Sequence, residues 1–235
     1  MINIVVLYPE LLNMFGDSGN ILCLKKRLMW RDIEVKITEI SLDSTVDLKD
    51  ADIVYIGGGG EAETLIALKK LSDYKEALKG YVEDGGVLLS VCSGYELLGK
   101  SLELKGEKRE GLGILDITST QSKKRISSDI VIESEFGLIA GFENHLGRMN
   151  IGSYSPLGRV KYGSGNNGTD GSEGLIYKNT FATYMDGPVL PKNPKLCDEI
   201  IKRALLNKGE STDLKELDDA IELTAQKYIL NKYSI

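Results

Sequence analysis

Histidine is nearly absent from this sequence, with one residue in 235, and cysteine and proline are scarce, with three and five. Cys23, Cys92 and Cys197 lie far apart without paired spacing, so neither a disulfide framework nor a zinc site is expected, and a reducing compartment is indicated. No apolar run approaches about 18 residues, and the apolar start of the chain is too short for a signal peptide. We therefore expect a cytoplasmic protein without membrane insertion, metal or cofactor.

The charge balance of the chain is acidic, with a formal net charge of −6 and a pI near 5.1. This balance argues against binding to nucleic acid or to an anionic membrane surface, and leaves small molecules and proteins as partners. With 42 % hydrophobic residues, the chain can bury a full core. We expect one domain over residues 1–235.

Apolar runs and helical stripes alternate through the first hundred residues. Strand patterns cover residues 2–8, 34–40, 52–56 and 87–91, and helical patterns cover residues from about 19 to 30 and 61–79. Asp17 or Ser18 is expected to cap the first helix. This order predicts an open α/β sheet, which binds ligands at the carboxyl ends of its parallel strands.

The second half of the chain predicts shorter strands at 113–118, 129–135 and 138–142, which would form an antiparallel extension of the sheet. The glycine-rich stretch 163–174 lacks the ending of a phosphate loop and is expected to be a hairpin loop before a strand over 175–184. Helices are predicted at 195–206 and, as an amphipathic C-terminal helix, at about 214–231.

Cys92 lies where the buried strand 87–91 turns into a helix that begins near Leu97. Small neighbours permit a sharp turn that holds the thiol clear of the sheet, which is a nucleophile elbow with sulfur in place of the serine oxygen. The alternative is that Cys92 is simply a small buried hydrophobe. The amides of Gly58, Gly59 and Ser93 are candidates for an oxyanion hole, although the run Gly57–Gly60 could equally be a plain tight turn.

Five segments together, in order along the chain, resemble the class I glutamine amidotransferases of the cobyric acid synthase type. These segments are Gly16-Asp17-Ser18-Gly19-Asn20, residues 85–99, Gly141-Phe142-Glu143-Asn144-His145, Gly165-Asn166-Asn167-Gly168 and residues 187–194. Within that group the chain is most similar to the amidotransferase subunits of lipid II isoglutaminyl synthases. The resemblance implies a flavodoxin-like, mostly parallel sheet with helices on both faces.

The resemblance also implies an activity. Glutamine would be hydrolysed through a glutamyl thioester on Cys92, and the ammonia would pass to an ATP-dependent, Mur-ligase-like partner that amidates a cell-wall precursor. Arg125 would bind the α-carboxylate of glutamine, a task that suits a guanidinium; the alternative is a solvated basic face shared with Lys123 and Lys124. His145 would be a structural residue or part of the site wall, with the role of base as the other interpretation.

The chain departs from the family pattern at the elbow and at the catalytic histidine. Family members read Gly-x-Cys-Gly-Gly-x-Gln, whereas this chain has Ser90, Ser93 and Glu96 around Cys92, and Asp186 replaces the histidine before Gly-Pro. Ionised carboxylates near the sulfur disfavour the thiolate.

Three functions therefore remain open. The chain could be a glutaminase subunit, with Asp186 or a water as base and Glu96 beside the substrate. It could instead be a degenerate binding or regulatory subunit, or a cysteine hydrolase of another amide.

Overall fold

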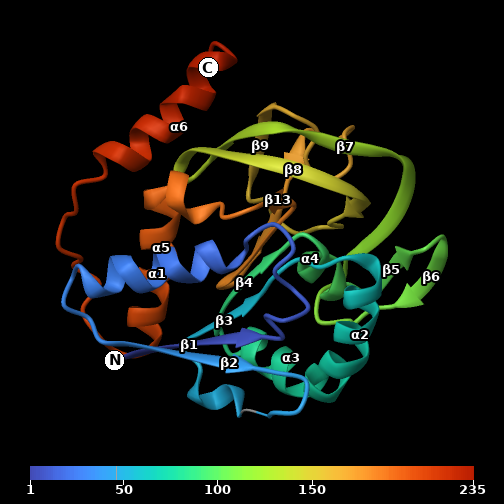
Figure 1. Cartoon of the computed structure of the whole chain (residues 1–235), viewed down its shortest axis with the longest axis horizontal. Coiled ribbons are helices and arrows are strands. Elements are labelled where there is room, and N and C mark those ends of the chain that lie inside the picture. The colour runs from blue at the N-terminus through green and yellow to red at the C-terminus, as the bar shows by residue number, and fades with distance from the viewer. Residues whose placement is uncertain (46) are drawn as a thin grey trace.

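A parallel sheet forms the centre of the molecule in the computed structural model, which describes residues 1–45 and 47–235 (Figure 1). Its strand order is β11-β12-β4-β3-β1-β2, and every pair except β11 with β12 is parallel. The strands are β1 (Ile2–Leu7), β2 (Val35–Ile40), β3 (Ile53–Ile56), β4 (Val87–Val91), β11 (Leu175–Tyr177) and β12 (Thr180–Thr183). The predicted α/β class is confirmed.

Alternation along the central strands gives the sheet two apolar faces, because successive side chains point to opposite sides. On one face, Val5, Val54 and Leu88 pack against α2 (Glu61–Leu71), α3 (Lys75–Glu83) and α4 (Ser93–Leu97). On the other, Ile4, Tyr55 and Leu89 pack against α1 (Ser18–Met29) and α5 (Pro194–Asn207). Helices therefore cover both faces, as the sequence predicts.

The antiparallel strands form a second sheet rather than continuing the first. Its strand order is β10-β9-β7-β5-β6, and β8 pairs with both β7 and β13. The strands are β5 (Ser101–Leu104), β6 (Glu107–Glu110), β7 (Thr118–Ser134), β8 (Gly137–Asn150), β9 (Gly158–Tyr162), β10 (Ser172–Glu173) and β13 (Met185–Asp186). The hairpin β7–β8 arches over the upper part of the molecule in Figure 1.

Several predicted boundaries are wrong. Residues 113–117 are not a strand, because amides from Leu112 to Leu115 donate to the carbonyls of residues 97–99, at and just after the end of α4, instead of to a neighbouring strand. The helix predicted over 61–79 is interrupted by the 3₁₀ turn η2 (Ser72–Tyr74), where the Ser72 hydroxyl donates to the Lys69 carbonyl. The strand predicted over 175–184 is divided by a turn at Lys178, whose φ is +52°.

The C-terminal helix α6 (Ala220–Lys232) begins later than predicted and lies at one side of the molecule (Figure 1). The segment before it is held by Arg27 of α1, which is 1 % exposed and donates to Asp198 of α5 and to Asp219. Two further 3₁₀ turns, η1 (Leu48–Asp50) and η3 (Leu190–Lys192), complete the described elements. No helix in the described ranges is long and apolar enough to span a bilayer.

Candidate active site

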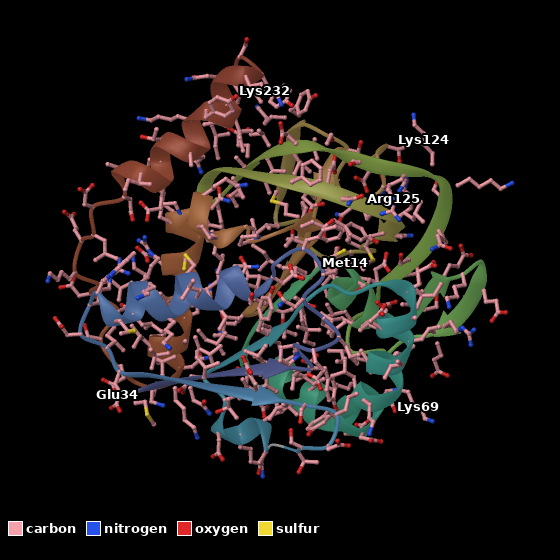
Figure 2. The ribbon with its side chains drawn as sticks, in the orientation of Figure 1. Met14, Glu34, Lys69, Lys124, Arg125 and Lys232 are labelled. Carbon is pink, nitrogen blue, oxygen red and sulfur yellow. The ribbon has the colours of Figure 1, made fainter. Side chains whose placement is uncertain are left out.

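A pocket of about 150 Å³ lies at the carboxyl ends of the parallel strands. Met14 and Phe15, which follow β1, line it together with Gly59 after β3, Cys92 after β4 and Tyr184 after β12. Arg125 of β7 and Met14 are labelled in Figure 2 on the side of the molecule where the pocket lies. The predicted location of the site is therefore the observed location of the pocket.

Cys92 adopts a backbone conformation that L-residues seldom occupy, with φ +51° and ψ −121°. Its amide donates to the Thr183 carbonyl at 2.8 Å, which fixes the turn to the end of β12. The residue is 9 % exposed and lines the pocket. This geometry is that of the strained strand-to-helix turn expected of a nucleophile elbow.

Gly58 is in close contact with Cys92. A Cβ added to Gly58 would lie 2.7 Å from the Cys92 Cβ and 3.3 Å from its Sγ, so a side chain does not fit there. The Gly58 amide donates to Asp17 Oδ2 at 2.9 Å. Asp17 is the N-cap residue of α1 but makes no side-chain hydrogen bond to that helix, so its carboxyl serves the site instead.

Two of the three amides predicted for an oxyanion hole are already engaged. In addition to the Gly58 amide, the Gly59 amide donates to the Ser93 hydroxyl at 2.9 Å, and Thr64 donates to the same hydroxyl at 3.0 Å. Within the described ranges the Ser93 amide has no acceptor. In this structure the Gly58 and Gly59 amides therefore have protein acceptors, whereas the Ser93 amide has none among the described residues. The oxyanion-hole role of the three amides stays a prediction.

Asp186 lies near the thiol, close enough for each group to shift the pKa of the other. Neither oxygen of its buried carboxyl has a hydrogen-bond partner within the described residues. It sits on β13, which pairs with β8 at Phe142, and is 5 % exposed. The pKa of Asp186 is raised to about 7, chiefly by burial and also by Asp17, although the Cys92 thiol, His145 and the Asn144 amide lower it. Asp186 opens onto a neighbouring hollow of about 370 Å³ lined also by Phe15 and Phe142.

The protonated form of the thiol is favoured by its surroundings. Burial raises the pKa of Cys92 well above 9.0, and Asp186, Glu96 and Asp17 each raise it further. Burial also raises the pKa of Asp17 to about 6, although the Gly58 amide lowers it. The thiol therefore has three carboxyl groups near it and its pKa is raised, the reverse of what activates a cysteine.

Glu96 is placed in the pocket wall by two hydroxyl groups. Tyr184 donates to Glu96 Oε1 at 2.7 Å and Ser119 donates to it at 3.0 Å. The residue is 7 % exposed, and burial raises its pKa while these two hydrogen bonds lower it. Gly147 lies directly against the Glu96 carboxyl, since a Cβ added to Gly147 would overlap Glu96 Oε1.

His145 lies in the pocket wall and stacks on Tyr184, with ring centroids 3.9 Å apart and planes 2° apart. Its Nδ1 is 2.8 Å from the Gly147 carbonyl, and its Nε2 is 3.9 Å from Glu143 Oε2. The ring is 3 % exposed. The placement corresponds to the site-wall interpretation.

Arg125 reaches the pocket from β7 with its side chain exposed. Its Nη1 contacts the Asn144 carbonyl and Asn144 Oδ1 at 3.3 and 3.2 Å. Arg125 lines the pocket and is also exposed to solvent. Its position therefore fits both interpretations from the sequence, a ligand of the glutamine carboxylate and a part of a solvated basic face. No grouping of His, Cys, Asp and Glu suited to a metal ion occurs within residues 1–45 and 47–235.

Asp17 and Tyr184 are site residues that the sequence did not reveal. Asp17 was expected as a helix cap and belongs to one of the five segments that carry the family resemblance, but neither signal indicates that its carboxyl reaches the Gly58 amide. Tyr184 immediately precedes the segment of Asp186, and its position two residues before that carboxyl was the available signal.

Comparison with known proteins gives concordant matches. Residues 3–194 match the CobB/CobQ-like glutamine amidotransferase domain. The lipid II isoglutaminyl synthase (glutamine-hydrolyzing) subunit GatD of Staphylococcus aureus is 41 % identical over 94 % of this chain and 91 % of its own. The subunit of the same name from Streptococcus pneumoniae is 37 % identical over 94 % of this chain and 87 % of its own.

The fold comparison agrees with the sequence matches. A crystal structure of a glutamine amidotransferase superimposes with a TM-score of 0.56 and 19 % identity, covering 85 % of this chain and 98 % of that one. At that identity the likeness concerns the fold alone. The family match and the two relatives carry the assignment: this chain belongs to the CobB/CobQ-like glutamine amidotransferase family.

Proposed function

We propose that this chain is the glutamine-hydrolysing subunit of an amidotransferase that modifies a cell-wall precursor of the lipid II type. The observation that carries the proposal is Cys92 on a strained elbow at the floor of a pocket. The relatives in Staphylococcus aureus and Streptococcus pneumoniae, named for lipid II isoglutaminyl synthase, support the choice of substrate. Their description as subunits supports a separate partner, which we propose is an ATP-dependent, Mur-ligase-like enzyme that consumes the ammonia.

Asp186 acts as the base in this mechanism. A thiol with a pKa above 9.0 is less than about 1 % ionised at pH 7, so the proton must leave as the sulfur attacks. The Asp186 carboxyl, with a pKa of about 7, is about half ionised at that pH and lies beside the thiol. Cys92 Sγ adds to the carboxamide carbon of glutamine and Asp186 takes the thiol proton.

The same proton then serves the leaving group. Collapse of the tetrahedral intermediate breaks the carbon–nitrogen bond, protonated Asp186 gives its proton to the departing nitrogen, and ammonia and a Cys92 thioester remain. Water then adds to the thioester carbonyl with Asp186 again as base, which releases glutamate. The Ser93 amide faces the developing oxyanion in both steps.

A second candidate is a subunit that binds glutamine without turning it over. It is favoured by the carboxyl groups around the thiol and by the engagement of the Gly58 and Gly59 amides. In that case the fold and the partner surface would be retained while the chemistry is lost. Glutamine binding without glutamate release distinguishes this candidate from the first.

The proposal is tested with the purified chain together with its co-expressed partner. We expect release of glutamate from glutamine and covalent trapping of Cys92 by an electrophilic glutamine analogue, both detected by mass spectrometry. Cys92→Ser abolishes both, whereas Cys23→Ser, which removes a thiol that does not line the pocket, preserves both. Wild-type chain that binds glutamine yet releases no glutamate would instead establish the binding subunit.

Replacing Asp186 by histidine is expected to increase turnover, because an imidazolium favours the thiolate where a carboxylate disfavours it. General acid–base assistance is typically worth about 10²–10⁴-fold, and we expect a gain within this range for Asp186→His. The effect is coupled to Glu96→Gln, since both changes act on the same sulfur. Asp186→Asn, which has neither base nor charge, is the matched control and lowers turnover. Equal turnover in Asp186→His and Asp186→Asn would contradict the role of Asp186.

The raised pKa values make stability depend on pH in a defined direction. Asp17 and Asp186 titrate near 6 and 7 when folded, against 3.8 as the ordinary value, so the folded state binds more protons. The stability they contribute is complete below 3.8 and is lost as the pH rises through about 6 to 7. Asp186→Asn removes the contribution of Asp186 to this pH dependence, on the order of 4 kcal/mol between about pH 4 and pH 8.

Urea unfolding at a series of pH values measures this contribution of Asp186 to the free energy of unfolding. Asp84→Asn, at an exposed position at the end of α3, is the control and keeps the wild-type slope. If the free energy of unfolding of Asp186→Asn changes with pH as steeply as that of wild type, Asp186 titrates at its ordinary pKa and the prediction is wrong.

A further inference from the structure

Two cysteines outside the pocket meet between α1 and α5. Cys23 Sγ and Cys197 Sγ are 3.7 Å apart, although the residues are 174 positions apart in the chain. Cys23 is half-buried and Cys197 is completely buried in the apolar layer between these helices and the sheet. Cys23 is therefore the member of the pair on the solvent side, and Cys197 is the enclosed one.

The surroundings of Cys23 differ from those of Cys92. The contact with Cys197 and the nearby Arg27 guanidinium lower the pKa of Cys23, although burial, Glu222 and Asp198 oppose them. Around Cys92 the charged groups all raise the pKa. Because the thiolate is the reactive form, oxidation favours Cys23.

We propose that Cys23 and Cys197 are a reversible oxidation site, in which a hydroperoxide converts the two thiols into a disulfide between α1 and α5. A disulfide brings two sulfurs to about 2.05 Å, so the pair closes by about 1.7 Å from its present separation. The proposal requires the two side chains to rotate toward each other within the interface between α1 and α5.

The reaction balances without any other reagent. The Cys23 thiolate attacks one oxygen of hydrogen peroxide, the oxygen–oxygen bond breaks, and Cys23 sulfenic acid and one water form after proton uptake. Cys197 sulfur then attacks Cys23 Sγ, the sulfur–oxygen bond breaks, and a second water leaves. Two thiols are oxidised by two electrons, and one peroxide is reduced to two waters.

The cross-link would join the two helices that support the acidic side of the pocket. Asp17 directly precedes α1, and Asn20 of α1 accepts from the Leu190 amide of η3, just before α5. Gly19 lies against Pro188, which follows Asp186 by two residues. A bond between Cys23 and Cys197 therefore fixes the frame that places Asp17 and Asp186, and it also restricts the unfolded chain.

The test treats the intact wild-type chain with a small excess of hydrogen peroxide, followed by alkylation of free thiols and non-reducing peptide mapping. We expect loss of two hydrogens from the intact mass, a Cys23–Cys197 linked peptide, an unmodified Cys92 and a melting temperature several degrees higher. A thiol reductant restores the original mass and melting temperature.

Two variants separate the proposal from general oxidation. Cys92→Ser forms the linked peptide to the wild-type extent, and Cys197→Ser accumulates a Cys23 sulfenic acid that dimedone traps. Oxidation of wild type at Cys92 with Cys23 still free to alkylate would overturn the proposal. So would conversion of Cys23 to sulfinic acid in wild type without a linked peptide.

Discussion

The site depends on the close approach of two strand ends, at Gly58 after β3 and Cys92 after β4. The 2.7 Å that would separate a Gly58 Cβ from the Cys92 Cβ allows only hydrogen at this position. That approach turns the Gly58 amide toward Asp17 and presents the next amide to the Ser93 hydroxyl. The left-handed backbone of Cys92 is maintained because both neighbouring strands and the start of α4 hold it there.

Electrostatics then decide what the thiol can do. The start of a helix stabilises a nearby anion by about 0.3–1 kcal/mol when exposed, and α4 is a helix of only five residues. Burial and three carboxyl groups act in the opposite direction, and together they raise the pKa of Cys92. Burial and the carboxyl groups together outweigh the helix effect, so catalysis needs a base that takes the proton during attack. Asp186, with a pKa of about 7, is the group whose position and acidity suit that role.

The sequence predicted the parallel sheet, the elbow and the place of the pocket, because continuous apolar runs and small-residue turns are local signals. It also predicted antiparallel strands at 129–135 and 138–142, which fall on the paired strands β7 and β8, but not that these strands belong to a separate sheet. The long hairpin β7–β8 alternates polar and buried residues irregularly and has a register shift between Gln121 and Ile126. Nor did the sequence predict that Asp17 reaches Gly58, since that contact joins residues 41 positions apart. Pairing of distant residues depends on tertiary packing, which no local pattern contains.

The most direct test of the account is a titration of the Cys92 thiol by carbon NMR on protein labelled at the cysteine Cβ atoms. The account predicts that Cys92 titrates above the ordinary value of 9.0, because burial and the neighbouring carboxyl groups favour the neutral thiol. Titration of Cys92 below about pH 7 would mean that the thiolate is stabilised as in a cysteine–histidine enzyme, and would contradict the account.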